Sequence, residues 1–205
     1  MSNVPFHLSD RPIANPSCIG SEHLQEIEEL PVDTVFVLGS GNFGMALAFH
    51  LAHHLNDKIT IYARDEAVVQ SINEKHINPK YLSEISLPEN MRATSSISKE
   101  ILDAHSVLLF CIPTQHMRSV LEKNRDAILN SERRHLCIFA NKGIEGGTLQ
   151  LPYEIIADVM GKEFSDRCVF LSGPSFAIEI VQRQPTCVTV ASQNLDCALW
   201  AQRVL

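Results

Sequence analysis

The chain has 205 residues, of which 45% are hydrophobic and 20% are charged, and its formal net charge is −7. These values are ordinary for a globular protein of one or two domains. The acidic balance argues against a nucleic-acid-binding surface, because polyanions are held by concentrated lysine and arginine. No apolar run reaches the roughly 18 residues that a membrane-spanning helix requires.

The six cysteines are scattered, without a C-x-x-C pair or a spacing that would suit a metal. Cys111 and Cys137 lie inside apolar runs, where a free thiol behaves as a small hydrophobic group. This usage favours a reducing compartment over a disulfide-linked scaffold. The start of the chain lacks a secretory signal and is too acidic for a transit peptide, so we expect a cytoplasmic protein.

Residues 1–31 are rich in serine, proline and asparagine, which predicts a disordered extension before a folded domain at 32–205. From Thr34 onward, short apolar runs alternate with helical stretches. The runs predict strands at 34–38, 58–63, 106–112, 135–140, 168–171 and 187–191, with a further short strand near 91–93. The stretches between them predict helices at 43–55, 66–75, 119–129 and 151–160.

Several of these runs are almost continuously apolar, as expected of strands that are buried on both faces. The alternation therefore predicts an α/β doubly wound fold with a mainly parallel sheet. A last helix is predicted at 195–205, with Leu195, Ala198 and Leu199 on its apolar face. It ends without glycine, asparagine or proline, so we expect a truncated domain, and a fraying terminal helix is the alternative.

A glycine-rich turn follows the first predicted strand. Residues 39–44 read Gly-Ser-Gly-Asn-Phe-Gly, which has the spacing G-x-G-x-x-G. In such a turn, Gly39 permits a tight bend, Gly41 lets the backbone approach a pyrophosphate, and Gly44 lets the helix pack on the strand. Because a strand precedes the turn and an apolar helix and second strand follow it, the sequence predicts a dinucleotide site of the Rossmann type.

The tip of the second strand, Ala63-Arg64-Asp65, lies where the adenosine ribose is recognised. An acidic residue there would bind the ribose hydroxyls of NAD, and an arginine would accommodate the 2′-phosphate of NADP. Arg64 comes first, which favours NADP and leaves NAD open.

Ligands of open α/β sheets lie beyond the carboxyl ends of the strands, where this chain places Pro113, Lys142 and the loop 172–177. Lys142 could stabilise charge at a carbonyl that is being reduced, or it could be a surface lysine before a turn. The loop 172–177 has backbone N–H groups and hydroxyls that could bind a ligand near Lys142. The alternative is that this loop only packs between a strand and a helix. Three histidines of the first helix, at positions 50, 53 and 54, have no further ligand at a suitable spacing, so we expect no metal site.

Several segments together resemble the bacterial-type family of NAD(P)-dependent glycerol-3-phosphate dehydrogenases. They are the glycine turn, Asn-Pro-Lys-Tyr-Leu at 78–82, Leu-Pro at 87–88, Asn-Lys-Gly-Ile-Glu at 141–145, Leu-Ser-Gly-Pro-Ser-Phe-Ala-Ile-Glu at 171–179, Pro-Thr at 185–186 and Val-Ala-Ser at 190–192. The resemblance covers residues 34–205. It implies reversible hydride transfer between NAD(P)H and dihydroxyacetone phosphate to give sn-glycerol 3-phosphate, within glycerol-phosphate and phospholipid metabolism.

The resemblance also implies residue roles. It adds Asn42, Phe43, Lys142 and Ala177 as cofactor contacts and agrees with Arg64 at the adenosine end. The full set of expected cofactor-binding residues is Gly39, Ser40, Gly41, Asn42, Phe43, Gly44, Arg64, Pro113, Lys142 and Ala177. Lys142 would also be catalytic, and it would contact the substrate together with Gly173 and Ser175.

In that family, the main proton-donating lysine lies in a glycine-rich segment beyond the last residue of this chain, and the groups that bind the substrate phosphate lie later still, in an all-helical substrate domain. We therefore expect that domain to be absent, the activity of the 205 residues alone to be doubtful, and a homodimer to be possible for the full-length protein. Two alternatives remain: a non-catalytic NAD(P)H-binding module, and another two-domain Rossmann reductase of the ketopantoate or hydroxyacid type.

Overall fold

A seven-stranded sheet forms the centre of the structure, a computed structural model that describes residues 34–55, 58–132 and 135–205. The extension expected at residues 1–31 lies outside the described residues. The strands are β1 (Val35–Leu38), β2 (Ile59–Tyr62), β3 (Met91–Thr94), β4 (Val107–Phe110), β5 (Leu136–Phe139), β6 (Val169–Ser172) and β7 (Thr189–Ala191). Their order is β3-β2-β1-β4-β5-β6-β7, and only β7 runs antiparallel to its neighbour. The predicted α/β fold with a mainly parallel sheet is confirmed.

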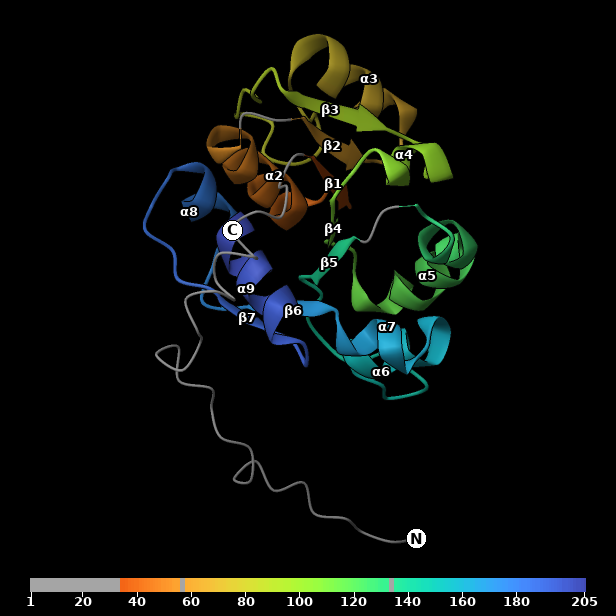
Figure 1. The fold of residues 1–205 in the computed structure, drawn as a ribbon. Coiled ribbons are helices and arrows are strands. Elements are labelled where there is room, and N and C mark those ends of the chain that lie inside the picture. Colours follow the sequence, from red (N-terminus) through yellow and green to blue (C-terminus); the bar gives the residue numbers. More distant parts are fainter. Residues whose placement is uncertain (1–33, 56–57, 133–134) are drawn as a thin grey trace, which may run out of the picture. The chain divides into compact units, whose positions relative to one another are not determined.

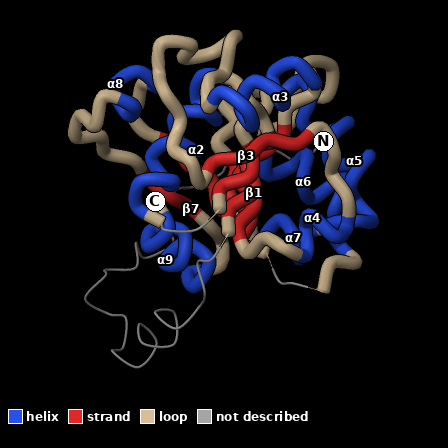
Figure 2. The backbone as a smooth tube through the Cα atoms, turned by 90° about the horizontal axis from the view of Figure 1, so that it is seen from above, coloured by secondary structure: helices blue, strands red, loops and turns tan. Residues whose placement is uncertain are grey.

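Helices cover both faces of this sheet. They are α2 (Asn42–His54), α3 (Glu66–Lys75), α4 (Lys99–Asp103), α5 (Thr114–Leu129), α6 (Pro152–Met160), α7 (Lys162–Asp166), α8 (Ala177–Val181) and α9 (Leu195–Val204). Figure 1 shows α4, α5, α6 and α7 on one side of the strands and α2, α8 and α9 on the other, and Figure 2 shows the same layers from above. Among the described residues, no helix has the length and apolar character that would let it cross a membrane.

The core is built on the three central strands. Every residue of β1, β4 and β5 is buried, which explains why their sequences are continuously apolar. The rings of Phe110 and Phe139 stack across β4 and β5, with centroids 4.3 Å apart. Met117 and Leu121 of α5 and Ile155 of α6 pack against the same cluster. Burial of these side chains fixes the sheet, and with it the strand ends that carry the candidate site.

Some boundaries differ from those that the sequence predicts. Helix α5 begins at Thr114 rather than at 119, because Pro113 directly precedes the helix and its φ of −58° suits that position. The prediction for the apolar face of the last helix was wrong, since Leu195 is 43% exposed. The residues that α9 buries are Cys197, Trp200, Ala201 and Val204. The five-residue helices α4, α7 and α8 were not predicted, because one turn and a half leaves almost no periodicity to read.

Candidate functional site

The candidate site lies where the strand order reverses. The chain proceeds outward from β1 through β2 to β3, and it then returns to the other side of β1 to place β4 and β5. The adjacent carboxyl ends of β1 and β4 therefore diverge into helices on opposite faces, as the strands and helices of Figure 1 show. Such a point is where open α/β sheets bind their ligands. The glycine turn follows β1 and Pro113 follows β4, so both predicted segments meet there.

The three glycines of the turn have different surroundings. Gly39 has a φ of +128°, and a Cβ atom there would lie 2.5 Å from the carbonyl oxygen of Cys111, which directly follows β4. A Cβ atom on Gly44 would overlap the carbonyl oxygen of Gly39. Gly41 is different, because its Cβ atom would meet no protein atom within 4 Å. The protein itself thus requires glycine at 39 and 44, whereas position 41 opens onto free space that a ligand could fill.

Helix α2 begins at this turn with no side-chain cap. Its N-cap is Gly41, its first turn holds no acidic residue, and its first hydrogen bond runs from the Met45 N–H to the Gly41 carbonyl at 2.9 Å. By contrast, α3 is capped by Asp65 and α9 by Asn194. The first N–H groups of α2 and its dipole therefore face the open space beside Gly41, which suits a pyrophosphate.

A buried asparagine fixes the turn from outside. The Asn78 side chain is fully buried, and its amide donates to the Ser40 carbonyl at 3.1 Å. Its carbonyl oxygen accepts the N–H groups of Lys80 at 3.0 Å and Tyr81 at 3.2 Å. The segment 78–82 is thereby held against the glycine turn. Sequence reasoning used this segment only for its resemblance, although the Asn-Pro pair is a turn signal.

The tip of β2 carries a carboxylate, Asp65, that is paired with other groups, and an exposed guanidinium, Arg64. Asp65 accepts the N–H of Ala67 at 2.9 Å and pairs with the Lys80 ammonium at 2.5 Å. The Lys80 hydrogen bond, and then that of Ala67, lowers the pKa of Asp65, so its carboxylate stays ionised. Arg64 is exposed, and among the described residues it forms no ion pair.

Lys142 and Phe43 are brought together by the ends of β5 and β1. The Lys142 ammonium lies 5.4 Å from the centroid of the Phe43 ring, and the lysine is exposed. The side chain of the preceding Asn141 donates to the Ile112 carbonyl at 2.5 Å, while its own buried Oδ1 has no hydrogen-bond partner among the described atoms. This arrangement places a cation and an unused acceptor beside the glycine turn, and both fit a polar ligand.

The first turn of α5 clamps the loop that carries Lys142. The Thr114 hydroxyl donates to the Lys142 carbonyl at 2.9 Å. The Gln115 amide donates to the Ile144 carbonyl at 2.8 Å and accepts the Gly146 N–H at 2.8 Å. The loop is therefore held by side chains that reach it from α5, and its lysine does not depend on the loop alone for its position.

An ion-pair network extends this clamp. The Arg118 guanidinium binds both carboxylate oxygens of Glu145, with Nε 3.1 Å from Oε1 and Nη2 3.0 Å from Oε2. Arg118 also pairs with Asp158 at 2.8 Å and donates to Gln150. Hydrogen bonds from Arg118 and then Thr148 lower the pKa of Glu145. Sequence reasoning missed Arg118, because the pairing depends on α5 and the loop meeting in space.

The loop after β6 has a different environment. Gly173 has a φ of +146°, and a Cβ atom there would lie 2.8 Å from the carbonyl oxygen of Cys187, so close packing requires this glycine. The Ser175 N–H donates to the Gly173 carbonyl at 3.0 Å. Ala177 begins α8, which packs against α2. Within the described residues, neither Gly173 nor Ser175 forms a hydrogen bond with Lys142. The structure thus places Ala177 at the start of a helix that packs on α2, and it places Gly173 and Ser175 in the loop between β6 and that helix.

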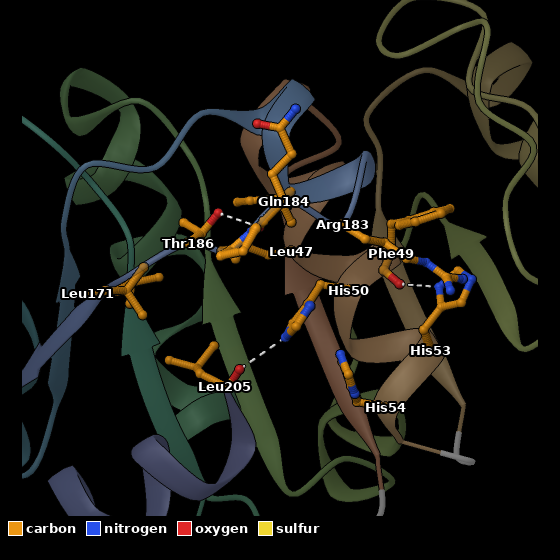
Figure 3. Close-up of a pocket in the computed structure, with 13 residues that line it drawn as sticks. Leu47, Phe49, His50, His53, His54, Leu171, Arg183, Gln184, Thr186 and Leu205 are labelled. Carbon is orange, nitrogen blue, oxygen red and sulfur yellow. Dashed lines mark hydrogen bonds between the residues drawn. The ribbon is translucent and has the colours of Figure 1, made fainter.

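A separate apolar pocket of about 460 Å³ lies beside the last turns of α2, next to residues 183–188 and the end of α9. Figure 3 shows His50 pointing to the Leu205 carbonyl, 3.0 Å away, and His53 pointing to the Phe49 carbonyl, 2.8 Å away. Burial lowers the pKa of His50. In the described part of the chain no group of side chains could hold a metal. This pocket is at the opposite end of α2 from the glycine turn, so it is not the dinucleotide crevice.

Comparison with known proteins points to one family. Residues 34–198 match the family described as NAD-dependent glycerol-3-phosphate dehydrogenase N-terminus. The chain is 38% identical to a glycerol-3-phosphate dehydrogenase (NAD(P)+) of Myxococcus xanthus over 170 residues, which are 82% of this chain and 49% of that protein.

Solved structures agree. A glycerol-3-phosphate dehydrogenase of Coxiella burnetii is 26% identical with a TM-score of 0.69, covering 80% of this chain and 48% of its own. One from Plasmodium falciparum is 25% identical with a TM-score of 0.73, covering 89% and 52%. The chain thus spans about half the length of the curated relatives it matches.

Proposed function

We propose that this chain, which belongs to the NAD-dependent glycerol-3-phosphate dehydrogenase family, is the cofactor-binding half of an oxidoreductase. The proposed reaction is reversible hydride transfer between NAD(P)H and dihydroxyacetone phosphate, giving sn-glycerol 3-phosphate. The dinucleotide, when bound, supplies or accepts the hydride. One observation carries the proposal: Gly39 and Gly44 are fixed by packing, whereas Gly41 opens onto free space at an uncapped helix end.

The proposed cofactor contacts follow from this geometry. The backbone of Ser40, Gly41, Asn42 and Phe43 would bind the pyrophosphate, since its N–H groups begin α2. Pro113 would border the same crevice because it follows the neighbouring strand, and Ala177 because its helix packs on α2.

Lys142 is the proposed catalytic group. Its ammonium, held over the Phe43 ring, would donate to the carbonyl oxygen of the substrate and stabilise the negative charge that develops there during reduction. Gly173 and Ser175 are proposed as substrate contacts on the family resemblance, and their loop would have to lie close to Lys142 when substrate is bound.

The preferred cofactor is proposed to be NADP. Asp65 is occupied as the cap of α3 and as the partner of Lys80, so it is poorly placed to bind the ribose hydroxyls of NAD. Arg64 is exposed and has no acidic partner among the described residues, which leaves its guanidinium for a 2′-phosphate.

A cytoplasmic location and a homodimer of the full-length protein are also proposed. The location is supported by five free cysteines in the described residues, among which burial raises the pKa of Cys111 to about 12. The homodimer rests on the family resemblance alone.

The first experiment measures cofactor binding by the 205-residue chain, with NADH and NADPH titrated by their fluorescence. We expect binding by the native sequence and a loss of about tenfold or more in Gly41→Ala, because the new methyl group occupies the space of the pyrophosphate. Its urea midpoint should stay close to that of the native chain, since the φ of −73° suits alanine.

A second experiment assays turnover of dihydroxyacetone phosphate by the protein purified from its own cells. Oxidation of NADPH or NADH that requires this substrate would support the dehydrogenase. Cofactor binding without turnover would favour the non-catalytic module instead, and the absence of binding would overturn both.

A further inference from the structure

We propose that Lys80 completes, together with Arg64, a binding site for the 2′-phosphate of NADP, and that Asp65 holds Lys80 in position while that phosphate is absent. This inference rests on the proposed function, because it assumes that a dinucleotide occupies the crevice beside the glycine turn. It adds a residue from outside the β1-α2-β2 unit to the recognition of the cofactor.

The first support is the placement of Lys80. Its segment is tied to the glycine turn by the buried Asn78 side chain, which donates to the Ser40 carbonyl and accepts the Lys80 N–H at 3.0 Å. The Lys80 ammonium then reaches Asp65, the residue next to Arg64 at the tip of β2. Lys80 thus bridges the two places that a dinucleotide must touch, the pyrophosphate turn and the adenosine ribose.

The second support is the exposure of the ion pair. The side chains of Lys80 and Asp65 are 56% and 42% exposed, and such surface pairs contribute little to stability. A phosphate monoester near neutral pH carries a charge of about −1.5 to −2 and three strong acceptor oxygens. It would therefore compete well for the ammonium against a single carboxylate, while Asp65 would keep its bond to the Ala67 N–H.

The same geometry predicts discrimination between the cofactors. The 2′-hydroxyl of NAD is neutral, so it cannot draw Lys80 away from Asp65, and the carboxylate stays occupied. With NADP, the phosphate would be bound by Arg64 as a planar donor and by Lys80 as a flexible point charge. Lys80 should therefore affect the affinity for NADPH and leave that for NADH nearly unchanged.

Three variants of the 205-residue chain test this, each titrated with NADPH and NADH separately. Lys80→Met removes the ammonium and keeps the stem. Asp65→Asn removes the competing carboxylate, and asparagine is an equally good helix cap. Lys75→Met is the matched control, because Lys75 is also an exposed lysine but lies at the other end of α3 from Asp65.

We expect Lys80→Met to weaken NADPH binding about tenfold, and to change NADH binding less than about twofold. Asp65→Asn should tighten NADPH binding about threefold, a gain that damage to the fold could not produce. Equal effects of Lys80→Met and Lys75→Met, or equal effects of Lys80→Met on both cofactors, would overturn the inference alone. A native chain that binds neither cofactor would overturn the proposed function, and this inference with it.

Discussion

At the scale of single residues, the glycine turn separates structural from functional need. Gly39 and Gly44 are enclosed by backbone atoms of the turn and of residue 111, whereas Gly41 faces open space. Gly39 and Gly44 are therefore needed for the packing of the protein, whereas Gly41 is available for ligand binding. Substitution of each glycine can separate the two roles.

We predict that Gly44→Ala destabilises the protein by about 3 kcal/mol or more, because the added carbon overlaps the Gly39 carbonyl and the backbone must shift. The measurement is urea unfolding of the variant beside Gly41→Ala, which should lie within about 1 kcal/mol of the native chain. Equal decreases in the free energy of unfolding in the two variants would show that the close packing around Gly44 does not contribute to stability.

At the scale of elements, helix α5 acts as a clamp for the Lys142 loop. Its first turn bonds the loop backbone through Thr114 and Gln115, and its second turn binds Glu145 through Arg118. The same helix buries Met117 and Leu121 in the core. The position of the exposed Lys142 is therefore fixed through α5 relative to the sheet.

This clamp predicts a dependence of stability on pH. The pKa of Glu145 is lowered in the folded protein, so its contribution is fully present above the ordinary glutamate pKa of about 4.3 and is lost as pH falls through the lower folded value. In Arg118→Met, the decrease in urea midpoint between about pH 5 and pH 3 should be shallower than in the native chain. Arg125→Met, on the same helix, is the control and should keep the native slope.

The elements also show what sequence could predict. The apolar runs predicted the strands and the parallel sheet, because a strand that is buried on both faces has a continuously apolar sequence. The glycine spacing predicted the turn. The contacts of Asn78, Lys80 and Arg118 were not predictable, since each pairs residues that are separated in the sequence by at least one whole helix or strand. The face of α9 was misassigned for the same reason, as its partners lie on strands β5, β6 and β7.

At the scale of the whole molecule, a bound dinucleotide would contact the ends of strands on both sides of the reversal in strand order. Binding to the folded state alone stabilises it by mass action, by about 2.7 kcal/mol at a ligand concentration of 100 times Kd. We therefore predict that NADPH raises the thermal midpoint of the described domain, and that the rise is greatly reduced in Gly41→Ala at the same concentration. A rise of the same size in both proteins would place the cofactor away from the glycine turn.

The contact of Gly39 with the carbonyl of Cys111 has a consequence for the order of folding. The motif itself is short, but Cys111, which packs against it, directly follows β4, a strand that the chain reaches only after completing β2 and β3. A growing polypeptide that ends at β3 would contain every glycine of the turn but would lack the Cys111 backbone that packs against Gly39. The crevice can therefore form only when β4 pairs with β1, which is a contact between residues far apart in the sequence. Pulsed hydrogen exchange during refolding would reveal this as protection of the turn amides that appears together with that of β4.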